Sequence, residues 1–184
     1  MMVVGAVGYA IVISLLLRVD LRGLKDVRLR YEVLLPAGLA LQLGAPYLPG
    51  VADSWVPAVW QVGALLLIVT SLLNWDYLGF KVVAAGVLLN AAVILVNWGM
   101  PVSADALVYL GAHDFESLIA ASSPLYFLAD EATSLLTLGD VLPVPGPSII
   151  RSVASLGDVM LMIGVVVLII EMAETPIRPK PSVG

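Results

Sequence analysis

The chain has 184 residues, of which 60% are apolar and only 12% charged, with a formal net charge of −5. A mean hydropathy of +1.02 excludes an ordinary soluble domain, so the composition predicts a protein whose solvent is the lipid bilayer. The chain contains no cysteine and one histidine, which excludes disulfides, thiolate metal sites and a histidine-rich metal cage within one copy.

Apolar runs predict five membrane spans, at residues 2–17, 33–49, 56–73, 78–96 and 158–172. The first run has no preceding basic residue and no small-x-small cleavage site, and an arginine-rich segment follows it directly. We therefore expect a retained span with its N-terminus outside. Pro36, Gly44 and Pro46 predict that the second span is short and irregular at its outer end.

Basic residues are distributed very unevenly along the chain. With five spans, eight of the nine basic residues fall on the cytoplasmic side, in the loop 18–32, at the start of the fourth span and in the tail: Arg18, Arg22, Lys25, Arg28, Arg30, Lys81, Arg178 and Lys180. The exception is Arg151. The positive-inside rule then predicts an all-α integral membrane protein, a single domain over residues 1–184, multi-pass in the cell membrane, with its N-terminus out and its C-terminus in.

The segment 97–157 between the fourth and fifth spans has a composition of its own. Residues 97–150 contain no lysine or arginine and six acids, which are Asp105, Asp114, Glu116, Asp130, Glu131 and Asp140. Their apolar patches are too short to cross a bilayer, which takes about 20 helical residues. We expect a structured outer segment with interfacial helices or a lid.

Two aspartates in this region are candidate catalytic residues. Asp140 and Asp158 each follow a Leu-Gly pair, and the three prolines between them, Pro143, Pro145 and Pro147, force an extended or turning path that can return the second carboxylate to the first. Paired carboxylates can share a proton and activate water. The structural alternative is that Asp158 caps the last helix and Asp140 is a turn residue.

Arg151, Asn97 and His113 are candidate ligand-binding or partner-binding residues. Arg151 is expected to form a salt bridge with one of the aspartates, to contact a lipid phosphate or to bind an anionic substrate. His113, with Asp114 and Glu116 next to it, is either a weak set of hard metal ligands or part of a solvated loop. No metal site and no cofactor are predicted from these residues.

Polar side chains inside the spans need partners, because hydrocarbon offers none. Gln42, Gln61, Asn90 and Asn97 are interpreted as structural links between helices, with a substrate pathway as the alternative. Gly86 and the pair Gly157 and Gly164, seven residues apart, favour close helix packing.

Three stretches carry a family resemblance: NWGMPVSADAL at 97–107, LADEATSLLTLGDVLPVPGP at 128–147 and SLGDVMLMIG at 155–164. They resemble an uncharacterised bacterial family of small multi-span membrane proteins, a domain of unknown function with N-x-G-M-P-V and L-G-D-x-x-P-x-P motifs. This resemblance implies the architecture and no activity. The last span also looks like the final helix of lipoprotein signal peptidases, where an aspartate is catalytic, but the G-N-x-x-D-R segment of that family is missing and the predicted spans are one too many.

The sequence thus predicts a non-enzymatic accessory or binding component with an acidic, proline-rich outer segment. The alternative is an intramembrane hydrolase that uses Asp140 and Asp158 near the outer interface. Expected partners are membrane lipids, with a partner membrane protein or a second copy of the chain as further options. No basic face suggests nucleic acid.

Overall fold

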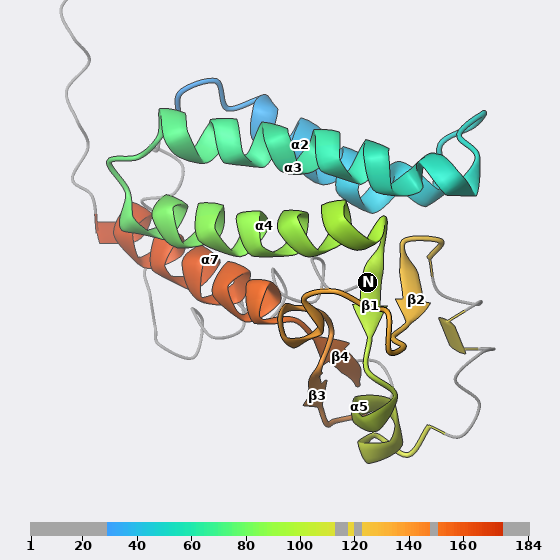
Figure 1. Ribbon diagram of the computed structural model, residues 1–184. Coiled ribbons are helices and arrows are strands. Elements are labelled where there is room, and N and C mark those ends of the chain that lie inside the picture. Colours follow the sequence, from blue (N-terminus) through green and yellow to red (C-terminus); the bar gives the residue numbers. More distant parts are fainter. Residues whose placement is uncertain (1–28, 113–117, 120–122, 148–150, 175–184) are drawn as a thin grey trace, which may run out of the picture.

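The computed structural model describes residues 29–112, 118–119, 123–147 and 151–174. Four helices form a row in which each contacts the next: α2 (Leu34–Gly44), α3 (Val56–Leu73), α4 (Leu78–Asn97) and α7 (Leu156–Glu174). In Figure 1 the α2–α3 pair lies on one side of α4 and α7 lies on the other. Two short 3-10 helices, η2 (Ala45–Tyr47) and η3 (Asp53–Trp55), join α2 to α3.

Within the described residues, three helical stretches are long and apolar enough to cross a membrane: Asp53–Leu73, Leu78–Asn97 and Leu156–Ala173. They coincide with three of the predicted spans, 56–73, 78–96 and 158–172. The predicted span 33–49 is only an 11-residue helix followed by η2, and 11 residues rise about 16 Å. Pro46 lies in η2 and cannot donate a helical hydrogen bond. The predicted span 2–17 lies outside the described residues.

Glycines set the distance between neighbouring helices. A Cβ atom built on Gly86 would lie 2.6 Å from the carbonyl oxygen of Gly157, and one built on Gly79 would lie 2.7 Å from that of Gly164. Residue numbers rise along α4 as they fall along α7, so these two helices are antiparallel. The expected small-residue packing is confirmed, and it allows backbone contact along two helical turns.

Hydrogen bonds also connect the helices at the end of the row that lies far from Asn97, around the turn between α3 and α4. The amide nitrogen of Arg30 donates to Oδ1 of Asn74 at 2.9 Å, and Asn74 Nδ2 donates to the carbonyl oxygen of Arg30 at 3.1 Å. Glu171 on α7 accepts from the amides of Leu78 and Gly79 at 2.9 and 2.8 Å. A carboxylate at the first turn of α4 satisfies free N–H groups and complements the helix dipole.

The inter-helix segment, residues 98–155, corrects the all-α prediction because the part of it that the structure describes contains four short strands. β1 (Met100–Val102) pairs in parallel with β2 (Tyr126–Leu128), and β3 (Leu142–Val144) pairs antiparallel with β4 (Ser152–Ala154). The segment also contains the helix α5 (Ala104–Tyr109) and the 3-10 helix η4 (Leu136–Leu138). Strands of three residues leave no alternating pattern in a sequence, so periodicity could not predict them.

The main hydrophobic core joins the helices to the inter-helix segment. Buried residues of α3 and α4 pack with Met100 of β1 and Leu125, which precedes β2. Tyr126 is partly buried and packs against both this core and a smaller one around Val102, Ala106 and Val153. The segment is therefore part of the fold and is not a loose connection between spans.

Candidate functional site

A buried polar cluster joins α4 to the start of α7. Asn90 on α4 donates from Nδ2 to Oδ1 of Asp158 at 3.0 Å, and Ser155 Oγ donates to Oδ1 of Asn90 at 2.8 Å. Ser155 is fully buried and Asn90 is 3% exposed. Gly157 makes this possible, because a Cβ atom there would collide with the Asn90 amide.

Ser155 and Asp158 form a capping box at the N-terminus of α7. The amide of Asp158 donates to Ser155 Oγ at 2.9 Å, and the amide of Ser155 donates to Oδ2 of Asp158 at 3.1 Å. Each side chain thus satisfies an N–H group at the helix start, as in the S-x-x-E motif, with aspartate in place of glutamate. α7 begins at Leu156, so the residue at its N-cap position is Ser155. The structural alternative from the sequence gave this capping role to Asp158.

The cluster lies well inside the helix row. Asn90 precedes the end of α4 by seven residues, which corresponds to about 10 Å of helix. It follows the start of α4 by twelve residues, or about 18 Å. A membrane-spanning α4 would place these groups within hydrocarbon, where every polar atom needs an internal partner.

A β-hairpin brings Asp140 to the same place. Leu142 pairs with Ala154, the residue before Ser155, and the amide of Val141 donates to the carbonyl oxygen of Ala154 at 3.1 Å. The proline-rich stretch between β3 and β4 turns the chain, so residues far apart in sequence become neighbours. Asp140 is also bridged to Val102 of β1, and its amide donates to the Pro101 carbonyl at 2.9 Å.

Asp140 is an electrostatically unusual carboxyl group. It is 3% exposed, and its Oδ1 is buried with no hydrogen-bond partner in the described part of the chain. Burial raises the pKa of Asp140 well above the ordinary carboxyl value, and the nearby charge of Asp158 raises it further. Burial also raises the pKa of the Tyr126 phenol, and the charges of Asp140 and Asp158 raise it further.

The β3–β4 pairing therefore brings the two candidate catalytic aspartates to the same region of the fold, but they differ in their bonding. Both oxygens of Asp158 accept hydrogen bonds from protein groups, Asn90 and Ser155. Asp140 favours its neutral form, which costs less to bury than a carboxylate. A carboxyl group that favours its neutral form next to a second, hydrogen-bonded carboxyl group can act as the acid of an acid–base pair, and it can equally stabilise a closed hydrogen-bonded core.

The other candidate residues have different surroundings. Arg151 is exposed and donates to carbonyl oxygens, from Nε to Gly146 at 3.3 Å and from Nη1 to Leu110 at 3.4 Å. The described residues contain no salt bridge from Arg151 to either aspartate, so the expected ion pair is wrong there. His113 lies outside the described residues.

Asn97 attaches the inter-helix segment to the end of α4. Its Nδ2 donates to the carbonyl oxygens of Val93 and Ser134, both at 2.9 Å, and the amide of Ser134 donates to its Oδ1 at 3.0 Å. Next to it, Trp98 has a left-handed backbone with φ of 53°, and its Nε1 donates to the carbonyl oxygen of Ser54 at 2.9 Å. Asn97 thus positions the segment.

Sequence reasoning missed Ser155, Tyr126 and Glu171 as contributors. The S-x-x-D spacing before an apolar run was a readable signal for Ser155. Tyr126 and Glu171 act through contacts with residues distant in sequence, and nothing local marks them. Among the described residues no group of three or more His, Asp or Glu side chains is arranged to hold a metal ion.

A family model matches residues 26–170 of the chain, and its description is "Family of unknown function (DUF5317)". No curated protein and no solved structure matches the chain.

Proposed function

The chain belongs to the DUF5317 family of unknown function, and we propose that it is a multi-span membrane protein that acts as a non-enzymatic accessory or binding component. Three helices with the length and composition of membrane spans support the location. The proposed topology has five spans, including 2–17 and 33–49, with the N-terminus outside and the C-terminus inside. The inter-helix segment then lies on the outer side.

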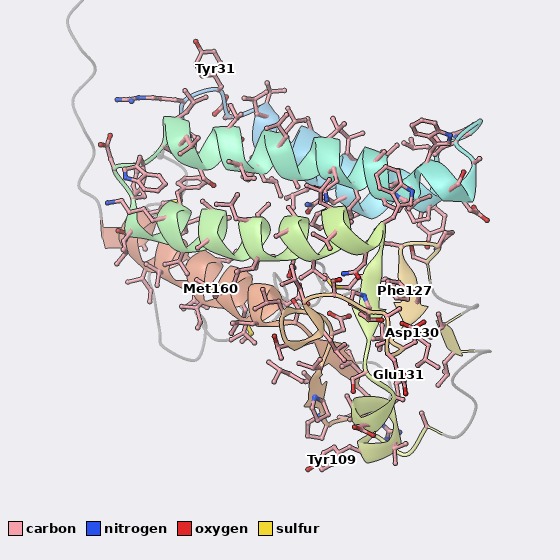
Figure 2. The ribbon with its side chains drawn as sticks, in the orientation of Figure 1. Tyr31, Tyr109, Phe127, Asp130, Glu131 and Met160 are labelled. Carbon is pink, nitrogen blue, oxygen red and sulfur yellow. The ribbon has the colours of Figure 1, made fainter. Side chains whose placement is uncertain are left out.

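The binding surface in this proposal is an acidic turn held rigidly on the end of α4. Asp130 closes the turn by accepting from the amide of Ala132 at 3.0 Å and from Oγ1 of Thr133 at 2.9 Å. Asn97 holds the next residue, Ser134, through two hydrogen bonds. Glu131 is exposed, and Figure 2 shows Asp130 and Glu131 together on the inter-helix segment.

This anchoring is the observation that best supports a binding role. A turn fixed by hydrogen bonds loses little conformational entropy when a partner binds, and its charges attract a basic partner. The partner in this proposal is a protein surface or peptide that carries lysine or arginine.

Site-specific photocrosslinking in native membranes tests this role. A crosslinking residue at Ala132 should give one adduct of defined mass, and its yield should fall in Glu131→Lys and at high salt, because salt screens exposed charges. The matched control is the same residue at Leu65, which is 59% exposed on α3 and should give lipid adducts only. Equal adduct patterns from the two positions, or a yield that Glu131→Lys does not change, would refute the binding role.

The second candidate is an intramembrane hydrolase, and the hairpin that brings Asp140 to the segment just before Asp158 supports it. In such an enzyme Asp158 would release a hydrogen bond to polarise water while Asp140 donates a proton. Asp140→Asn and Asp158→Asn would each abolish the cleavage of a membrane substrate while the protein stays folded. If both variants leave every membrane-protein cleavage product unchanged in cells, the hydrolase is excluded.

A further inference from the structure

One edge of the inter-helix segment exposes apolar and basic side chains together. Val108 and Tyr109 of α5 are 58% and 71% exposed, Leu142 of β3 is 40% exposed, and Arg151 is exposed beside β4. α5 and β3 contact each other, and Arg151 Nη1 donates to the carbonyl oxygen of Leu110, the residue after Tyr109. We call these residues the α5–β3 edge. Figure 2 shows Tyr109 at the part of the molecule farthest from α2 and α3.

The α5–β3 edge lies beside the helix row near the Asn97 end of α4. α7 begins opposite Gly86 and Asn90, about 10 Å short of the end of α4. Figure 1 shows β1 running across the helix axes from the end of α4, with α5 at its far end and with β3 and β4 between α5 and the start of α7. In a bilayer with about 30 Å of hydrocarbon, this position is the boundary between lipid tails and headgroups.

The chemistry of the edge fits that boundary. Tyrosine is typical of membrane interfaces, and arginine reaches the phosphate layer while its stem covers apolar surface. Arg151 is the only basic residue between Lys81 and Arg178. Its guanidinium is oriented by two long bonds to neutral carbonyl groups, which leaves its charge uncompensated by these contacts.

The position of Asp105 indicates which headgroup charge the α5–β3 edge would accept. Asp105 is exposed and precedes Val108 and Tyr109 by three and four residues on α5, so it shares their side of the helix. A carboxylate there disfavours a layer of purely anionic headgroups and complements the ammonium of a zwitterionic one.

We propose that the α5–β3 edge rests on the phospholipid headgroup layer beside α7, with Arg151 binding the phosphate of a zwitterionic headgroup. This inference depends on the proposed membrane location of the helices. It makes the inter-helix segment a surface with two roles, since the acidic turn at Glu131 faces partners in water while the α5–β3 edge contacts lipid.

Spin labels on single cysteines in the full chain test the proposal, because the natural sequence contains no cysteine. The labelled variants are Tyr109→Cys, Ala132→Cys and Leu65→Cys, reconstituted in phosphatidylcholine vesicles. Collisions with oxygen, which dissolves in lipid, are compared with collisions with a water-soluble nickel complex. We expect the oxygen-to-nickel ratio at 109 to lie between the ratio at 65, in the hydrocarbon, and the ratio at 132, in water, and to be well above the ratio at 132.

The three labels separate the possible failures. If 65 contacts oxygen and 109 resembles 132, the membrane location stands and the lipid contact of the edge is refuted. If 65 itself is accessible to nickel, the proposed membrane location fails.

The role of Arg151 is tested in the same vesicles. Arg151→Gln should lower the oxygen-to-nickel ratio at 109 and leave the ratio at 65 unchanged, whereas Arg151→Lys should retain most of the contact. The same ratio at 109 in Arg151→Gln and in the parent would refute phosphate binding. Added inorganic phosphate should not change the ratio at 109, and if it does, the site takes a free anion in place of a headgroup.

Discussion

Adding one methyl group at Gly157 should loosen the contact between α4 and α7. A Cβ atom at Gly157 would lie 2.7 Å from the carbonyl oxygen of Gly86 and would collide with the side-chain amide of Asn90. Both neighbours are held in place, Gly86 by the α4 backbone and Asn90 by hydrogen bonds to Asp158 and Ser155. The helices must therefore move apart by several tenths of an ångström.

The cost of Gly157→Ala can be worked out from these contacts. Overpacking of this kind costs about 1–3 kcal/mol, and two interhelical hydrogen bonds in a membrane protein contribute about 0.6 kcal/mol each. The higher helix propensity of alanine returns about 1 kcal/mol. The net loss of unfolding free energy should be about 1–3 kcal/mol.

Unfolding in mixed micelles of dodecyl maltoside and sodium dodecyl sulfate, followed by tryptophan fluorescence, measures this loss. Gly44→Ala is the matched control, because a Cβ atom there has nothing within 4 Å and its φ is −89°. That variant should be neutral or more stable than the parent by up to about 1 kcal/mol. Equal stability of the two variants would refute the close glycine packing and the position of the Asn90 cluster.

Three further substitutions address the charged and polar anchors. Burial raises the pKa of Asp140 in the folded chain, so its contribution to the free energy of unfolding is greatest below the ordinary carboxyl pKa and is lost as the pH rises through the folded pKa. Asp140→Asn should remove this loss. Unfolding measured between about pH 4 and pH 8 should therefore show that the variant becomes more stable than the parent as the pH rises. Asn97→Ala removes the bonds to Ser134 and should increase proteolytic cleavage at the acidic turn, while cleavage near the α3–α4 turn stays unchanged. Glu171→Gln weakens the carboxylate cap on the amides of Leu78 and Gly79 and should lower the free energy of unfolding by about 0.3–1 kcal/mol in the same micelle assay. The corresponding contact would be refuted by a pH-independent effect of Asp140→Asn, by unchanged cleavage in Asn97→Ala, or by unchanged stability in Glu171→Gln.

Long apolar runs explain why three helices could be predicted closely. The predicted spans 56–73 and 78–96 differ from α3 and α4 by at most one residue at an end. An apolar run of about 18 or more residues leaves few alternatives to a helix in a lipid environment. The span 33–49 was predicted to be short and irregular at its outer end, and α2 indeed ends at Gly44 and is followed by η2, because Pro46 interrupts the hydrogen-bond ladder.

The inter-helix segment was harder to predict because its order comes from distant contacts. β1 pairs with β2 across 23 intervening residues, 103–125, and three-residue strands have no periodic signature. The meeting of Asp140 with Asp158 depended on a proline-containing hairpin whose direction the sequence left open. The sequence predicted that the buried side-chain amide of Asn90 needs a hydrogen-bond partner. It did not indicate that the partners are Ser155 and Asp158.

The proposed binding role requires the inter-helix segment to lie on the outer side of the membrane, where the acidic turn meets its partner. Single-cysteine labelling with a membrane-impermeant maleimide in intact cells tests it directly, with Ala132→Cys in the acidic turn and Asp76→Cys in the exposed α3–α4 turn. We predict rapid labelling at 132 in intact cells and labelling at 76 only after permeabilisation. Labelling at 76 but not at 132 in intact cells would contradict the topology, and labelling of both would contradict the crossing of α4.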